Sequence, residues 1–275
     1  MDMANTSINL DDKFNIKKSN VLLNGTQGLV RLMLGQKLRD EKQGLNTAGF
    51  VTGYRGSPLG AVDFQMRRAS KELQASNIKF KEALNEDLAT TALWGAQQAE
   101  LRGEGLYDGV FGLWYGKGPG VDRSGDAMRH ANMAGSSVNG GVLMAMGDDH
   151  SGESSTVLHQ SDLAMIDAGM PILSPAGVQE ILDYGYYGFA LSRYSGLWVG
   201  LKTMKDTIEV TSVVDGDPFR MRFKNSKPKS GADNLNIRLV DTPADQEKRL
   251  LSDKKIAAEE FARINRIDKV GLPKG

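Results

Sequence analysis

The run of residues 142–146 constrains the fold more than any other segment of the chain. Its side chains are Val, Leu, Met, Ala and Met, with no polar residue at alternate positions. A strand with one face in water alternates polar and apolar residues. An uninterrupted apolar strand is instead typical of a parallel sheet that helices cover on both faces. The sequence therefore predicts an α/β fold with a mostly parallel sheet.

Other segments repeat the alternation of short apolar strands and helices that such a fold needs. The expected strands are 48–52, 109–114, 141–146, 171–173 and 197–201, and the expected helices are 28–41, 59–74, 86–101, 125–134 and 177–192. Strands that are separated by helices favour parallel pairing. We expect a flexible leader over residues 1–20 and one α/β domain over residues 21–205.

The composition changes after Lys202. Residues 208–214 and 218–223 are expected to form two strands joined by a turn at residues 215–217. Residues 206–275 are then expected to be connecting strands and a helix at the start of a following domain, so that the chain is the front part of a longer protein.

The expected terminal helix has a clear start. Thr242 provides a hydroxyl N-cap, Pro243 occupies the first helical position and an acid follows at Asp245. The helix is expected to carry Leu251, Ala258 and Phe261 on one side, with little around it to pack on.

Bulk composition excludes several functional classes. The 34 basic and 34 acidic residues balance, so no net field favours nucleic acid or a membrane surface. The chain has no cysteine, which excludes disulfides and iron–sulfur ligation within it. No apolar run is long enough to span a bilayer, and residues 1–20 lack the apolar core of a signal peptide. We expect a cytoplasmic protein that binds neither nucleic acid nor membranes.

Polar, glycine-bearing loops follow three of the expected strands, at residues 53–60, 118–126 and 147–155 with 159–162. The carboxyl ends of parallel strands meet at one edge of a sheet, and open α/β sheets bind ligands there. The loops match neither the dinucleotide fingerprint nor the phosphate-binding loop of nucleotide hydrolases. Residues 148–150 (Asp-Asp-His) are better explained as a turn cap than as metal ligands, and we expect no metal site in this chain.

Glu86 stands at the start of an apolar helix, close in sequence to the first of these loops. An acid at a helix N-terminus stabilises the helix dipole, which is a purely structural role. It can also serve as a catalytic proton carrier if it faces a ligand. The residues around Glu86 leave both roles open.

Five blocks, in order and with consistent spacing, resemble the N-terminal part of the indolepyruvate ferredoxin oxidoreductases, which belong to the 2-oxoacid:ferredoxin oxidoreductases. The blocks are residues 53–58, 85–96, 117–126, 147–155 and 160–162. The resemblance covers roughly residues 20–260 and is closest to the long, single-chain bacterial form. It implies the fold of the pyrimidine-binding module of thiamine diphosphate enzymes.

The resemblance also implies roles for individual residues. Glu86 is the implied catalytic acid, which hydrogen-bonds the pyrimidine ring of thiamine diphosphate. The implied cofactor-binding residues are Gly53, Tyr54, Gly56, Ser57, Pro58, Glu86 and Gly118, and the implied substrate contacts are Arg55, Lys117, His159, Gln160 and Asp162. The sequence departs from its relatives at Ser57, where they carry Thr, at Arg55, where they carry Pro, and at His159.

Two parts of such an enzyme are expected outside this segment. Relatives hold the diphosphate and its Mg²⁺ on a second module with a Gly-Asp-Gly motif, and residues 215–217 lack its context. The iron–sulfur clusters are likewise expected elsewhere in the full-length enzyme, so this segment alone is expected to be inactive. The implied reaction is oxidative decarboxylation of an aryl 2-oxo acid to an acyl-CoA. Coenzyme A and ferredoxin are the implied partners and a homodimer is the implied assembly.

Two alternatives remain open at this point. One is another thiamine-dependent enzyme of 2-oxo acids, such as a decarboxylase or a synthase. The other is a non-catalytic α/β subunit module that serves assembly or regulation.

Overall fold

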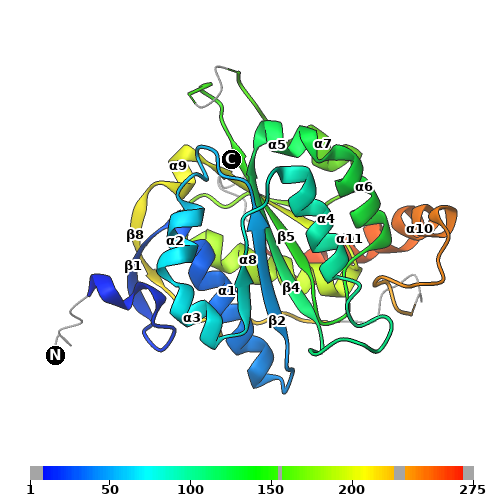
Figure 1. Cartoon of the computed structure of the whole chain (residues 1–275), viewed down its shortest axis with the longest axis horizontal. Helices are drawn as coiled ribbons and strands as arrows, with labels where there is room; N and C mark the ends of the chain where they lie inside the picture. The colour runs from blue at the N-terminus through cyan, green and yellow to red at the C-terminus, as the bar shows by residue number, and fades with distance from the viewer. Residues whose placement is uncertain (1–8, 154–156, 226–232, 269–275) are drawn as a thin grey trace, which may run out of the picture.

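A six-stranded parallel sheet lies at the centre of the chain (Figure 1). The computed structural model describes residues 9–153, 157–225 and 233–268. The strand order is β3-β2-β4-β5-β7-β6. The strands are β2 (Ala48–Gly53), β3 (Ile78–Phe80), β4 (Val110–Lys117), β5 (Val142–Asp148), β6 (Ile172–Leu173) and β7 (Val199–Met204). The predicted α/β class with a parallel sheet is confirmed.

Helices cover both faces of this sheet, which explains the uninterrupted apolar strands. One face packs against α1 (Gly25–Lys42), α2 (Val62–Arg68), α3 (Ser70–Ala75) and α8 (Val178–Ser195). The other packs against α4 (Glu86–Ala96), α5 (Gly118–Arg123), α6 (Gly125–Ala134) and α7 (Asp162–Asp167). Successive residues of a strand point to opposite faces of the sheet. Leu113 and Tyr115 of β4 therefore belong to the core on the α1 and α8 side, and Trp114 belongs to the core on the α4 and α6 side.

Some predicted elements differ in detail. The expected helix 59–74 is interrupted at Ala69, the shared cap between α2 and α3, where ψ leaves the helical region. The short strand β3 was not predicted because its three residues give no readable period. A helical turn, α5, stands where only a loop was expected, and it starts with glycine and proline.

The predicted hairpin of 208–214 with 218–223 is wrong. β8 (Thr211–Asp215) follows the short helix α9 (Lys205–Ile208) and pairs antiparallel with β1 (Asn20–Asn24). Residues 218–223 form no strand. Two of their carbonyl oxygens, those of Pro218 and Met221, accept hydrogen bonds from Arg39 of α1 instead of from a neighbouring strand.

Residues ahead of β1 contact the domain. Carbonyl oxygens within and just after the 3₁₀ helix η1 (Leu10–Phe14) bind the buried cation Arg31. Nη1 of Arg31 donates to the oxygens of Lys13 and Asn15, at 3.1 Å each. In the part of the chain that the structure describes, no helix combines the length and the apolar character needed to cross a membrane.

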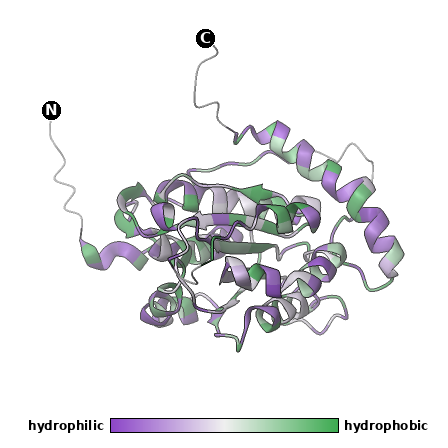
Figure 2. Cartoon of the chain, turned by 90° about the horizontal axis from the view of Figure 1, so that it is seen from above, coloured by the Kyte–Doolittle hydropathy of each residue, from purple (hydrophilic) through white to green (hydrophobic). Residues whose placement is uncertain are grey.

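The terminal helices run along the outside of the domain (Figure 2). α10 (Pro243–Arg249) begins as predicted, because the Thr242 hydroxyl accepts a hydrogen bond from the Asp245 amide at 3.3 Å. A π-helical turn, η2 (Leu250–Lys254), then joins it to α11 (Lys255–Asn265).

The expectation that this helix has little to pack on is wrong. Phe261 is fully buried, and its ring lies 5.1 Å from the rings of Tyr187 and Tyr194 of α8. Leu251, predicted on the same face, is instead 58% exposed, and Leu250 is buried. The wider π turn shifts the apolar face by one residue, which sequence periodicity does not anticipate.

Lys254, at the end of η2, fixes the terminal segment to the domain. Its side chain is fully buried, and Nζ donates to the carbonyl oxygens of Met133 (2.9 Å) and Ala134 (3.2 Å) at the end of α6. Burial, and after it the charge of Arg249, lowers the pKa of Lys254 to about 7. A buried cation therefore caps one helix and anchors another.

We expect Lys254 to make the free energy of unfolding rise with pH above about 7. The unfolded lysine has a pKa of 10.5, so between about 7 and 10.5 the unfolded state binds a proton that the folded state has lost. Stability increases with pH wherever the unfolded state binds more protons. Urea unfolding should show this rise, measured below about pH 10 where tyrosines begin to titrate.

The matched variants are Lys254→Met and Lys255→Met, since Lys255 is the exposed neighbour. The rise should disappear in the first variant and persist in the second. An equal rise with pH in both would show that another group causes it.

Candidate functional site

The ends of three neighbouring strands meet at the carboxyl edge of the sheet. Gly56, in the loop after β2, lies against Lys117 of β4: a Cβ added there would come within 2.8 Å of the Lys117 Cδ atom. Gly147 of β5 lies against the same loop, because its added Cβ would be 3.0 Å from Cδ of Pro58. A side chain at either position would have to displace its neighbour, so glycine allows these close approaches. The structure thus brings together the loops that the sequence predicted to converge.

Glu86 is buried beside this edge, with only 6% of its surface exposed. It is the first residue of α4, and Asn85 caps the helix by accepting a hydrogen bond from the Leu88 amide at 2.8 Å. The indole Nε1 of Trp114 donates to the Glu86 carbonyl oxygen at 3.1 Å. The Asn85 cap and the Trp114 indole together fix the first turn of α4 against β4. They thereby set the direction of the Glu86 side chain.

Two glycines border the Glu86 side chain. A Cβ on Gly120 of α5 would lie 2.5 Å from Glu86 Oε1, and one on Gly116 would lie 3.2 Å from Glu86 Cγ. Among the described residues, no side chain or amide donates a hydrogen bond to the carboxylate. The Glu86 oxygens are not among the described side-chain atoms that are both sealed from solvent and unpaired, so they remain open to a ligand. The arrangement therefore suits a carboxylate that binds a ligand.

His159 lies across α5 from Glu86. A Cβ on Gly118 would be 1.9 Å from His159 Nδ1, so the imidazole packs directly on the first residue of α5. Nε2 of His159 lies 2.9 Å from Asp122 Oδ2, also on α5. Helix α5 is thus held between Glu86 on one side and His159 on the other.

Asp148, at the end of β5, anchors the segment that carries His159. This fully buried carboxylate accepts hydrogen bonds from the Ser161 amide (3.0 Å) and hydroxyl (2.5 Å). Lys202 of β7 lies 3.8 Å from Asp148 and 2.6 Å from Asp162. Asp162, a predicted substrate contact, is therefore engaged in an ion pair.

The remaining predicted residues lie on the loops without forming one closed pocket. Gly53 ends β2 and packs on Tyr115, while Pro58 is buried after a cis peptide bond from Ser57. Tyr54 is 40% exposed, and Arg55, Ser57 and Gln160 are exposed as well. Sequence reasoning missed Gly116, Gly120, Asp122, Asp148 as an anchor, and Lys202. The sequence could have indicated Asp148 and Lys202 as site residues, since both are charged residues at the ends of apolar strands.

Another buried carboxyl, Asp63 of α2, lies on the other face of the sheet. Burial raises the pKa of Asp63, and burial also raises the pKa of the Tyr115 hydroxyl near it. Tyr115 belongs to the core on the α1 and α2 side, whereas Trp114, which holds Glu86, belongs to the opposite one. The sheet therefore separates Asp63 from Glu86.

Comparisons with known proteins find similarity to oxidoreductases of 2-oxo acids. No protein-family model matches it. Two curated relatives are similar to it, each named indolepyruvate oxidoreductase subunit IorA, from Pyrococcus horikoshii and Pyrococcus abyssi. Each is 27% identical over 227 residues, which is 82% of this chain and 31% of the relative. The comparisons confirm the resemblance to the 2-oxoacid:ferredoxin oxidoreductases.

A solved structure shares the fold. It is a 2-oxoglutarate:ferredoxin oxidoreductase from Magnetococcus marinus, with 2-oxoglutarate, coenzyme A and succinyl-CoA bound. The TM-score is 0.59 at 15% identity, over 89% of this chain and 46% of the other. The chain thus spans about a third of the length of its curated relatives and about half of this structural one.

Proposed function

We propose that the chain is the pyrimidine-binding part of a thiamine diphosphate-dependent oxidoreductase that acts on aryl 2-oxo acids. The observation that carries the proposal is the Glu86 carboxylate, buried at the carboxyl edge of the sheet with two glycines beside it. The similarity to indolepyruvate oxidoreductase subunits supports the reaction class and the aryl substrate. Coenzyme A and ferredoxin are the proposed co-substrate and electron acceptor.

The residues present fit one half of a thiamine diphosphate site. Thiamine diphosphate supplies the carbanion chemistry that decarboxylation of a 2-oxo acid requires. Glu86 would hold and exchange a proton at its Oε atoms with the pyrimidine ring, and Gly120 leaves room for that carboxylate against α5. Gly53, Tyr54, Gly56, Ser57, Pro58 and Gly118 would border the cofactor. The diphosphate, its Mg²⁺ and the iron–sulfur clusters are proposed to be held outside this segment.

We propose different roles for the five predicted substrate residues. His159 and Asp162 pair with Asp122 and Lys202, so they hold the loops in place. Arg55 is exposed at the rim and forms no ion pair with any described residue, which suits it to binding the substrate carboxylate. Lys117 would lend a second positive charge, and Gln160 a polar contact.

We expect Arg55→Gln to raise KM for the 2-oxo acid roughly tenfold, since losing one exposed charge-assisted hydrogen bond costs about 1.4 kcal/mol. The kcat should not fall, because the carboxylate leaves as CO₂ during the reaction, so this contact stabilises the bound substrate and not the transition state of decarboxylation. Arg102→Gln, an exposed arginine at the opposite edge of the sheet, is the control. An unchanged KM in the Arg55 variant would remove this residue from the substrate site.

The proposed reaction is tested by turnover of the intact protein. Indolepyruvate, pyruvate and 2-oxoglutarate are supplied in turn with coenzyme A and ferredoxin, with and without thiamine diphosphate. The proposal expects ferredoxin reduction that requires the cofactor and is fastest with indolepyruvate. Preference for 2-oxoglutarate or pyruvate would contradict the aryl substrate, and activity without thiamine diphosphate would contradict the cofactor.

A further inference from the structure

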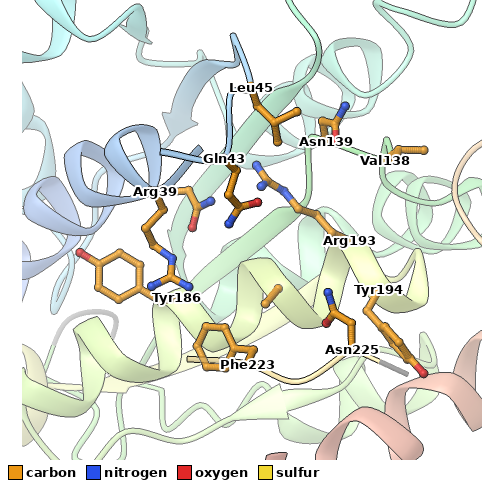
Figure 3. Close-up of a pocket in the computed structure, with 12 residues that line it drawn as sticks. Arg39, Gln43, Leu45, Val138, Asn139, Tyr186, Arg193, Tyr194, Phe223 and Asn225 are labelled. Carbon is orange, nitrogen blue, oxygen red and sulfur yellow. The ribbon is translucent and has the colours of Figure 1, made fainter. Parts of the chain in front are cut away.

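A cationic cavity, shown in Figure 3, opens at the amino edge of the sheet. Glu86 lies at the opposite, carboxyl edge. Its volume is about 320 Å³, near the lower end of the range of small-molecule pockets, roughly 300–1,000 Å³. It lies between the end of α1, the turn before β5 and the last turns of α8. The lining side chains that the argument uses are Arg39, Gln43, Asn139, Arg193 and Phe223.

The lining has positive charge and no carboxylate. Arg39 and Arg193 both reach the cavity, and none of its lining residues is Asp or Glu. Figure 3 shows the two guanidinium groups on either side of the Gln43 side chain. The charge of Arg193 is neutralised by buried Asp40, because the Nη1 and Nη2 atoms of Arg193 bind the two Asp40 oxygens at 2.6 and 2.8 Å. The excess positive charge therefore belongs to Arg39.

Arg39 has hydrogen-bond donors that the described residues do not use. A guanidinium carries five N–H groups. Its Nη1 atom binds the carbonyl oxygens of Pro218 and Met221, and its Cζ lies over the rings of Tyr186 (5.3 Å) and Phe223 (5.2 Å). The Nε and Nη2 atoms have no acceptor in the part of the chain that the structure describes. Burial lowers the pKa of Arg39, as expected for a cation without a carboxylate partner.

Neighbouring groups strengthen this positive field. Lys42 lies one turn further along α1, with Nζ 4.0 Å from the centre of the Phe219 ring. The amides of Gln43 and Asn139 add neutral donors around the cavity. Several N–H groups that converge from different elements suit a tetrahedral anion better than a planar one. The apolar ring of Phe223 leaves space for a small organic group.

We propose that this cavity is a binding site for a small phosphate-bearing molecule, anchored by Arg39. The site is separate from the edge that carries Glu86 and does not rest on the proposed reaction. Its ligand would bridge the end of α1 and the segment 218–223 that Arg39 already holds, and would thereby stabilise the folded chain.

The test measures the rise in melting temperature of the purified protein with inorganic pyrophosphate, against sodium chloride at equal ionic strength. Gln43→Glu places a carboxylate of the same size between the two arginines. It should raise the melting temperature without ligand and weaken pyrophosphate binding at least tenfold. Gln74→Glu, the same change at an exposed position of α3, should leave binding unchanged.

Two results would overturn the proposal. One is the absence of a pyrophosphate effect on the unaltered protein beyond that of chloride. The other is equal pyrophosphate binding by the unaltered protein and the Gln43→Glu variant, which would place the anion elsewhere. If Gln43→Glu does not fold, Val138→Glu adds the charge at a lining position that is 59% exposed, and the same comparison applies.

Discussion

Glu86→Gln should lower kcat of the intact protein by about 10²–10⁴-fold, the usual contribution of a positioned proton-transfer group. Glutamine has the same shape and leaves the hydrogen bonds from Trp114 and Thr90 to the Glu86 carbonyl oxygen in place. What it removes is a carboxyl group that can hold and release a proton. The measurement is steady-state turnover, with circular dichroism to show that the variant is folded.

The structural explanation of Glu86 makes a different prediction. If the acid only stabilises the dipole of α4, its loss costs about 0.3–1 kcal/mol of stability and leaves turnover intact. Asp87→Asn is the matched control, because Asp87 stands in the same first turn. The proposed role requires a large kcat loss at Glu86 and none at Asp87. Equal, small effects of the two substitutions on kcat would mean that Glu86 has only a structural role.

Gly120→Ala should also abolish most of the activity, through the position of Glu86. The added methyl would lie 2.5 Å from both Cγ and Oε1 of Glu86, so the carboxylate has to move. A displacement of about 1 Å can cost about 10²-fold in rate. The fold should survive, because the clash is with a movable side chain and alanine favours a helix over glycine by up to about 1 kcal/mol.

Gly125→Ala controls for the effect of alanine on a nearby helix. Gly125 begins α6, and a Cβ there would meet no atom within 4 Å. This variant should keep full turnover and equal or greater stability in thermal unfolding. If Gly120→Ala turns over as fast as Gly125→Ala, then the contact between α5 and Glu86 does not set the activity.

The fold could be predicted from local pattern because burial on both faces removes polar residues from each strand. This holds for β5, whose residues 142–146 are all fully buried. The local pattern predicts the wrong structure where burial does not determine the conformation of the backbone. Residues 218–223 have the composition of a strand, but their carbonyl oxygens bind Arg39, which lies far away in sequence.

The candidate site likewise has one part that sequence could predict and one part that only the fold shows. The place of Glu86 at the start of a capped helix could be predicted from sequence because the cap and the helix are local, whereas its proposed role comes from the family resemblance. The pairs that hold the loops could not, because Asp122 and His159 are 37 residues apart and Lys202 and Asp162 are 40 apart. The loops carry glycines in the sequence, but only the fold shows that Gly120 meets Glu86 and Gly118 meets His159.

The most direct test is a structure of the intact protein with thiamine diphosphate bound. The proposed function predicts a carboxylate oxygen of Glu86 within hydrogen-bond distance of a ring nitrogen of the pyrimidine, with Gly120 still packed against the same side chain. A bound cofactor whose pyrimidine ring lies away from Glu86 would contradict the assignment of this carboxylate, and with it the proposed role of the chain.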